Sequence, residues 1–282
     1  MEGATPGLVT VGGFPTHVRH WGHGGRAAVL IHCSLGQSAL WEGVAQGLGD
    51  ALSMTAFDLP GHGRSGDWEG PGDVQAQAVA MAADLIEGQA DLIGHSFGAT
   101  VALRLAAERP ALVRSLVLIE PVFFQLLPQD RPDLIARRDA EMADYTAAAA
   151  RGDWAEAARL FTAKWGDGRP WEDLSPAQQE TLARRIRVVE AASDVIRADG
   201  GGVLRSGALG RLEVPVLLME GAESPEYVAA IDAGLAARIP GARRVVVPGA
   251  GHMAPVTHPG AVAEEIRRFL GLPDRGDVAA GR

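Results

Sequence analysis

The sequence predicts an α/β protein, in which a mostly parallel central sheet is flanked by helices and interrupted by a helical segment, which we call the cap. Two observations predict the sheet. Short, continuously apolar runs such as Ala27 to Ile31 have the composition of strands buried on both faces. Helical patterns alternate with these runs, as in proteins whose parallel strands are joined by crossover helices. A third observation predicts the cap: from about Val122 to Leu209 the chain has helical periodicity and no convincing strand.

The length fits one domain with an insertion. A chain of 282 residues with 47% hydrophobic content is large enough to bury a full core. We expect residues 1–121 and 210–272 to form this core and residues 122–209 to form the cap. Residues 273–282 are expected to be a loose tail.

The first half of the chain predicts a hairpin followed by the first parallel strands. Leu8 to Val11 and Thr16 to Trp21 surround Gly12-Gly13, as two paired strands would. Apolar runs then follow in the order expected of a parallel sheet, at Ala27 to Ile31, Thr55 to Phe57, Ala90 to Ile93 and Leu116 to Ile119.

The second half predicts the cap helices and then a return to the sheet. The clearest cap helices are Asp139 to Arg151, Asp153 to Trp165 and Ser175 to Ala198. Gly200-Gly201-Gly202 is expected to be the flexible exit from the cap. After it come a strand, a helix, a strand and a helix, at Val214 to Met219, Glu226 to Ile239, Val245 to Val247 and Pro259 to Leu270.

One motif predicts a nucleophile. Gly94-His95-Ser96-Phe97-Gly98 lies between a predicted strand and a predicted helix, so Ser96 stands at the apex of a sharp turn that exposes its hydroxyl. Glycines suit the positions two residues either side of the serine, because side chains there would crowd the reversing backbone. The Phe97 amide is in the first helical turn, where it has no intrahelical partner and is free to bind an oxyanion.

Three further strands also end in polar, glycine-rich turns. These turns are His32 to Ser38, Asp58 to Ser65 and Pro248 to Met253. The carboxyl ends of parallel strands meet at one edge of an open α/β sheet, and ligands bind at that edge. A serine hydroxyl needs a base within hydrogen-bond reach, and His252 is the base that we expect. We expect His32 and His62 to tie the loops together, and His95 to point away from the serine.

With these motifs, the chain resembles the α/β-hydrolase family from about Val9 to Leu270. The nucleophile elbow of the family maps onto Gly94 to Gly98, and its histidine loop onto Gly249 to His252. Its Asp-x-Pro-Gly-His-Gly-x-Ser turn maps without change onto Asp58 to Ser65, and its oxyanion loop onto His32 to Gly36, with cysteine in place of the usual glycine. The resemblance implies that the amides of Ser34 and Phe97 form the oxyanion hole. The family is catalytically diverse, so the fold does not settle the function.

The acid of the triad departs from the family pattern. Relatives usually have an aspartate after the strand that follows the cap, where this chain has Ser224. Serine has no charge with which to stabilise an imidazolium. We expect Glu120, directly after the strand that precedes the cap, to be the acid, because some members such as haloalkane dehalogenases carry it there. The alternatives are Glu223, another acid, a Ser–His dyad, or a purely structural role for Glu120.

These residues predict acyl transfer to Ser96 from a small, apolar carboxylic ester or lactone, with no metal or organic cofactor. The alternatives are a carbon–carbon bond hydrolase, a cofactor-free perhydrolase, and a catalytically silent ligand-binding protein. Candidate substrate-binding residues are those of the oxyanion loop, cap and histidine loop that are large or apolar, namely Cys33, Phe123, Phe124, Trp154, Trp165 and Met253. The cap arginines, such as Arg137, Arg138, Arg184 and Arg185, are expected on a solvated face. If one pointed inward, it would favour a carboxylate-bearing substrate.

Composition narrows the partners. The net charge of −9 argues against nucleic acid or an anionic membrane surface. No apolar run approaches the length of a membrane span, and Met1 to Ala4 lacks the start of a secretory signal. A single cysteine, Cys33, excludes an internal disulfide. We therefore expect a cytoplasmic protein that acts on a small molecule. The sequence does not determine its oligomeric state.

Overall fold

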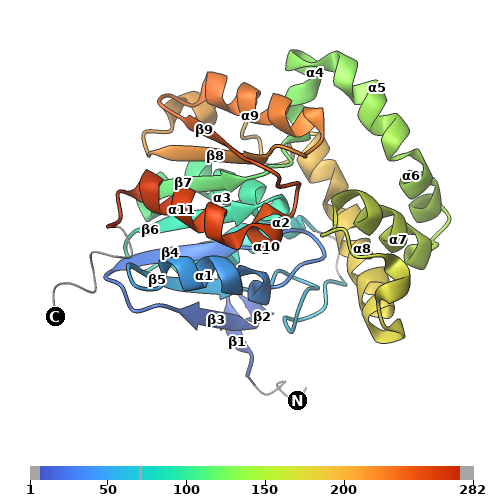
Figure 1. Cartoon of the computed structure of the whole chain (residues 1–282), viewed down its shortest axis with the longest axis horizontal. Coiled ribbons are helices and arrows are strands. Elements are labelled where there is room, and N and C mark those ends of the chain that lie inside the picture. Colours follow the sequence, from blue (N-terminus) through green and yellow to red (C-terminus); the bar gives the residue numbers. More distant parts are fainter. Residues whose placement is uncertain (1–6, 70–71, 274–282) are drawn as a thin grey trace.

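The computed structural model describes residues 7–69 and 72–273, which form a layered α/β molecule (Figure 1). The predicted tail, residues 273–282, lies outside the described residues except for Pro273. The main sheet contains seven strands in the order β3-β5-β4-β6-β7-β8-β9. Their bounds are β3 Val18–Trp21, β4 Arg26–Ile31, β5 Leu52–Phe57, β6 Ala90–His95, β7 Val113–Ile119, β8 Val216–Gly221 and β9 Arg243–Val247.

The sheet is parallel except at one edge. Strand β3 pairs antiparallel with β5, and every other neighbouring pair is parallel. All the parallel strands therefore end at the same edge, and the predicted mostly parallel sheet is confirmed. The predicted opening hairpin is wrong in its second strand. β1 (Val9–Val11) pairs with β2 (Phe14–Thr16) in a separate two-stranded sheet, and β3 leaves it to join the main sheet.

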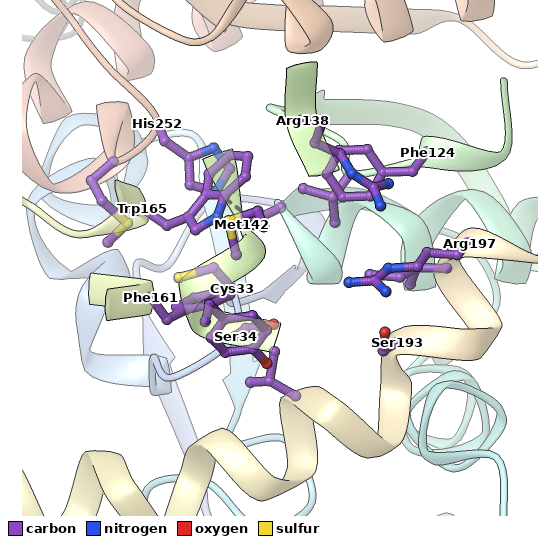
Figure 2. A pocket seen from close by; sticks show the side chains of 16 residues that line it. Cys33, Ser34, Phe124, Arg138, Met142, Phe161, Trp165, Ser193, Arg197 and His252 are labelled. Carbon is purple, nitrogen blue, oxygen red and sulfur yellow. Dashed lines mark hydrogen bonds between the residues drawn. The ribbon is translucent and has the colours of Figure 1, made fainter. Parts of the chain in front are cut away.

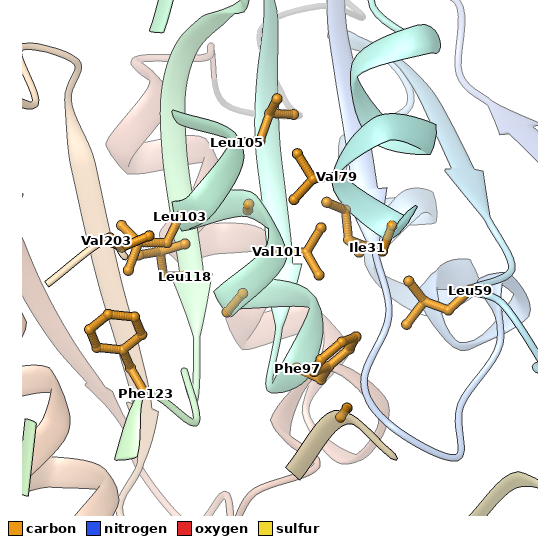
Figure 3. Packing of buried hydrophobic residues seen from close by; sticks show 14 of the residues in the cluster. Ile31, Leu59, Val79, Phe97, Val101, Leu103, Leu105, Leu118, Phe123 and Val203 are labelled. Atoms are coloured by element: carbon orange, nitrogen blue, oxygen red, sulfur yellow. The ribbon is translucent and has the colours of Figure 1, made fainter. Parts of the chain in front are cut away.

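Helices cover both faces of the sheet. On one face lie α1 (Glu42–Leu48), α10 (Ala254–Thr257) and α11 (Pro259–Leu270), and on the other lie α2 (Val74–Asp84), α3 (Phe97–Glu108) and α9 (Glu226–Arg238). Side chains of one strand alternate between the two layers: on β4, Ile31 joins the core under α2 and α3, whereas Leu30 joins the core under α1 and α11. Figure 3 shows the first core, where Val101 and Leu105 of α3 face Val79 of α2.

The segment between β7 and β8 is helical, as predicted, but its helices differ at the start. They are α4 (Leu127–Asp130), α5 (Pro132–Glu141), α6 (Ala143–Ala150), α7 (Trp154–Trp165) and α8 (Pro176–Arg197). The single helix expected over Asp139 to Arg151 is therefore wrong, because α5 ends and α6 begins on either side of Met142. We call residues 122–209 the helical insert. It projects beyond the sheet, beside the strands' carboxyl edge (Figure 1).

Short 3-10 helices lie between the other elements. They are η1 (Ser38–Trp41), η2 (Pro110–Leu112), η3 (Phe124–Leu126), η4 (Trp171–Asp173) and η5 (Ala208–Arg211). In the described part of the chain, no helix has the combination of length and apolar character that spanning a membrane requires.

Candidate active site

The predicted nucleophile stands on a strained turn between β6 and α3. Ser96 has φ +55°, a backbone conformation that side-chain-bearing residues rarely adopt. The flanking glycines are required sterically. A Cβ on Gly94 would lie 2.4 Å from the Gly98 carbonyl oxygen, and one on Gly98 would lie 2.2 Å from the Ile31 carbonyl oxygen. The elbow geometry that the motif predicts is thus present, and it lifts the Ser96 hydroxyl above the sheet edge.

His252 contacts the predicted nucleophile. Its Nε2 lies 2.9 Å from the Ser96 Oγ, and both residues are buried. The ring is enclosed on two sides: Trp165 of α7 packs edge-on with centroids 4.6 Å apart, and His95 lies 5.2 Å away. The Nε2–H of His95 donates to the backbone carbonyl of His252 at 2.8 Å. His95 therefore anchors the loop that carries His252, a contact that the sequence did not suggest.

Glu120 lies against the other nitrogen of this ring. It directly follows β7, has φ +52° and is completely buried. Its Oε2 is 2.9 Å from His252 Nδ1, while its Oε1 accepts hydrogen bonds from the Gly221 amide at 2.6 Å and the Ser224 hydroxyl at 2.7 Å. A carboxylate only accepts hydrogen bonds, so His252 carries its proton on Nδ1 and presents a lone pair on Nε2 to the serine.

The alternative acid is elsewhere. The side chain of Glu223 is exposed, and its backbone amide donates to the Ala250 carbonyl at 2.8 Å. The structure therefore brings Glu120, and not Glu223, to the histidine. The residue at the usual aspartate position, Ser224, contacts the Glu120 carboxylate instead of the imidazole.

The two residues whose amides are expected to form an oxyanion hole lie near the serine: Phe97 directly follows it, and Ser34 lines the same cavity. Phe97 is the first residue of α3, where its N–H has no intrahelical acceptor. Ser34 follows β4 and lines the cavity at Ser96. The next residue, Leu35, has φ +61°, so Leu35, Ser96 and Glu120 place three of the four positive-φ non-glycine residues of the described chain at this site. Such strain clusters where a surrounding structure holds a functional geometry.

Two neutral histidines tie the loop of Ser34 to the loop after β5, as predicted. The Leu59 amide donates to His32 Nε2 at 2.9 Å, and the Leu35 amide donates to His62 Nε2 at 3.1 Å. Both rings must be unprotonated at Nε2 to accept these bonds. Burial lowers the pKa of His32 to about 4 and that of His62 to about 3. Burial likewise lowers the pKa of His95 to about 3.

A cavity of about 80 Å³ adjoins the serine (Figure 2). Four of the predicted substrate-binding residues line it: Cys33, Phe124, Trp165 and Met253. Phe123 and Trp154 do not, and this part of the prediction is corrected. Phe123 is buried in the core beside α3, and Trp154 packs under the Arg187 guanidinium at 5.6 Å.

Further lining residues come from two faces of the helical insert that the sequence analysis did not identify. They recur at helical spacing: Arg138 is on α5, Met142 lies between α5 and α6, Tyr145 is on α6, and Val189, Ser193, Ile196 and Arg197 are on α8. Spacings of three and four residues place side chains on one helix face, and this periodicity was the available signal. Periodicity alone does not show which face of each helix turns toward the sheet.

The prediction that the cap arginines face solvent is wrong for two of them. Arg138 lines the cavity, and its side chain is 12% exposed. Arg185 of α8 is buried and donates to the carbonyls of Leu35 at 3.0 Å and Gly36 at 3.2 Å. It thereby joins the helical insert to the loop that carries Ser34.

A second, larger cavity of about 470 Å³ adjoins the first. The two share Cys33, Ser34, Phe161, Trp165 and Met253 as lining residues. Exposed residues of the insert, including Asp167 and Arg169, line its outer part, so it connects the inner cavity with the surface. Among residues 7–69 and 72–273, no group of three or more His, Cys, Asp or Glu side chains is placed to hold a metal ion.

Comparison with known proteins agrees with this architecture. Lipase LipV of Mycobacterium tuberculosis is 42% identical over 110 residues, which are 37% of this chain and 41% of that lipase, so the match spans less than half of the relative. A pimeloyl-(acyl-carrier protein) methyl ester esterase of Neisseria meningitidis serogroup A is 32% identical over 226 residues, covering 77% of this chain and 68% of that protein.

The structural and family matches cover more of the chain. The crystal structure of an alpha/beta hydrolase enzyme from a Medee basin deep-sea metagenome library superposes with a TM-score of 0.74 at 18% identity, over 95% of this chain and 98% of the other. The model of the "Alpha/beta hydrolase family" matches residues 28–265. That match covers well over half of this chain, and the chain therefore belongs to the α/β hydrolase family.

Proposed function

We propose that this protein is a serine hydrolase that cleaves a small carboxylic ester or lactone through an acyl-enzyme. The observation that carries the proposal is the buried relay from Ser96 Oγ through His252 to Glu120, with both hydrogen bonds at 2.9 Å. The ester-cleaving relatives, a lipase and a methyl ester esterase, support the same class of reaction. The mostly apolar lining of the inner cavity supports a substrate that is apolar near the scissile bond.

The relay supplies the first half of the reaction. His252 Nε2 takes the hydroxyl proton as Ser96 Oγ attacks the ester carbonyl carbon, and the resulting imidazolium is stabilised by the Glu120 carboxylate. The carbonyl oxygen becomes an oxyanion, held by the amides of Ser34 and Phe97. When the tetrahedral intermediate collapses, the bond to the leaving oxygen breaks, and Nε2–H gives that oxygen its proton.

The second half repeats these steps with water. His252 takes a proton from a water molecule that attacks the acyl-enzyme, and then returns a proton to Ser96 as the acid leaves. The outer cavity provides a path by which the alcohol departs and water enters, because it reaches exposed residues of the helical insert.

Labelling with a fluorophosphonate probe, followed by mass spectrometry of the modified peptide, tests the proposal. We expect one adduct on Ser96, and loss of labelling in His252→Ala because the serine then lacks its base. Ser96→Ala, checked for folding by circular dichroism, should not hydrolyse short-chain esters. Absence of labelling in the folded wild-type protein would instead favour the ligand-binding alternative.

A further inference from the structure

Two guanidinium groups line the otherwise largely apolar inner cavity. Arg138 comes from α5 and Arg197 is the last residue of α8. Figure 2 shows both side chains entering the cavity on the side away from His252 and Trp165. No aspartate or glutamate is among the described residues that line this cavity. On a largely apolar wall, the mostly buried charge of Arg138 attracts an anion more strongly than it would in water, whereas Arg197 is exposed.

The charges of these arginines are only partly compensated. Arg138 donates to the Asp139 carboxylate at 2.7 Å, but that carboxylate is 56% exposed, so the pair is weak. The Arg138 guanidinium also lies 4.9 Å from the centroid of the Phe124 ring, which holds it beside the cavity. Arg197 is exposed and forms no ion pair with a described side chain, so solvent screens part of its charge.

Neutral donors accompany the two cations. Ser193 is one turn before Arg197 on the same face of α8 and lines the cavity beside it. The Tyr145 hydroxyl, also on the wall, donates to the Glu190 carboxylate at 2.8 Å, and Glu190 itself does not line the cavity. The result is a wall with two fork-shaped cations and a hydroxyl, which is the donor set that binds carboxylates.

The size of the cavity limits the ligand. The inner cavity is the smaller of the two, at about 80 Å³ against about 470 Å³, which favours a short acyl chain. We propose that the cavity binds the acyl part of a monoester of a short dicarboxylic acid, with Arg138 and Arg197 holding its free carboxylate. This inference rests on the proposed role of Ser96, which also lines the cavity.

The placement of the acyl part follows from the two cavities. The alcohol leaves before the acyl group does, so it needs the larger cavity that reaches the surface. The acyl group stays bonded to Ser96 until water attacks, and the smaller inner cavity encloses it during that time. A carboxylate at the far end of a three- to five-carbon acid then lies toward the arginines.

Two esters of the same shape test the charge preference. Monomethyl glutarate carries the free carboxylate, and methyl glutaramate carries a neutral amide in its place. We expect wild-type kcat/KM to be roughly 10-fold to 100-fold higher for the charged ester, as for a hydrogen-bonded charge pair. This ratio should collapse in Arg197→Gln and Arg138→Gln, and should persist in Arg184→Gln, which changes an exposed arginine on the same helix.

A binding measurement separates the subsite from catalysis. Calorimetry of glutarate with the folded wild-type protein should give binding that weakens about 10-fold or more in Arg197→Gln and that also weakens at high salt. Equal turnover of both esters, or a ratio unchanged in both arginine variants, would overturn the subsite and leave the proposed hydrolysis standing. If neither ester is hydrolysed but glutarate binds in an Arg197-dependent way, the subsite stands and the hydrolase proposal fails. If glutarate does not bind, the subsite is wrong.

Discussion

Ser224 occupies the position at which relatives usually carry the acid of the triad, and here its hydroxyl donates to Glu120, the proposed acid, which follows another strand. Its hydroxyl and the Gly221 amide both donate to Glu120 Oε1, which leaves Oε2 for His252 Nδ1. Glu120 follows β7, whereas the usual site follows the neighbouring strand β8. A glutamate has one methylene more than an aspartate, and its carboxylate contacts the imidazole. The hydrogen-bond partners of one carboxylate thus explain why the chain has serine at 224.

This arrangement predicts a large and specific effect at Glu120. Glu120→Gln removes the negative charge and permits the wrong histidine tautomer, so we expect kcat to fall by about 10⁴-fold. Steady-state hydrolysis of a short-chain ester measures this. Glu223→Gln is the matched control, because its side chain is exposed, and it should stay near wild type. A comparable loss in the control, with Glu120→Gln unaffected, would assign the acid to Glu223.

At the scale of elements, helix α8 is coupled to the loop after β4. Arg185 reaches from this helix to the carbonyls of Leu35 and Gly36, and its Nη2 is 3.4 Å from Gln37 Oε1. The Leu35 backbone has φ +61°, a strained conformation that needs support from its surroundings. We infer that Arg185 is a positioning residue, which acts on the reaction through the loop that carries the Ser34 amide.

Arg185→Met tests this coupling, because methionine keeps an unbranched chain but removes the donors. We expect kcat to fall about 10-fold or more while KM changes little, since the oxyanion is present only after attack has begun. Arg184→Met, one residue away and exposed, should leave both constants near wild type. A lowered melting temperature with unchanged kcat would show that Arg185 only stabilises the fold.

How far the sequence carries the prediction also differs between elements. Strands buried on both faces and the strained elbow have strong local signals, so the sheet from β4 onward and the surroundings of Ser96 are predictable. The break at Met142 has no glycine or proline to mark it, and helical periodicity continues across it. Which arginine turns inward is decided by packing between helices distant in sequence, so Arg138 and Arg185 were assigned to the wrong surface.

At the scale of the whole molecule, three buried neutral histidines predict sensitivity to acid. Burial lowers the pKa of His32 to about 4, and those of His62 and His95 to about 3. The unfolded chain therefore takes up protons near pH 6.5, before the folded protein does, and stability falls as pH decreases from about 6.5 toward 4. Each histidine contributes a slope of about 1.4 kcal/mol per pH unit. Urea unfolding between pH 7 and pH 4.5 measures it, and a flat profile would contradict the prediction.

A buried carboxyl on α9 gives the opposite trend. Asp232 is completely buried, and neither of its oxygens has a hydrogen-bond partner in the described structure. Burial, followed by the nearby charges of Glu220 and Glu120, raises its pKa well above the usual value. In the unfolded chain this carboxyl ionises near pH 4, whereas the folded protein retains the proton. Stability is therefore lost as pH rises from about 4 toward the folded pKa.

Asp232→Asn removes this titration while keeping the shape of the side chain. We expect the variant to be more stable than wild type at pH 8, with a difference that shrinks toward pH 5, because only the wild-type carboxyl must remain protonated or ionise in a low-dielectric interior. Urea unfolding of both proteins at the two pH values measures this.

Asp144→Asn, at an exposed carboxylate, provides the control and should show no such pH dependence. An equal difference at both pH values would mean that the gain comes from packing or hydrogen bonding. The histidines make stability rise with pH up to about pH 6.5, and Asp232 makes it fall as pH rises further. Together they place the stability maximum near pH 6.5.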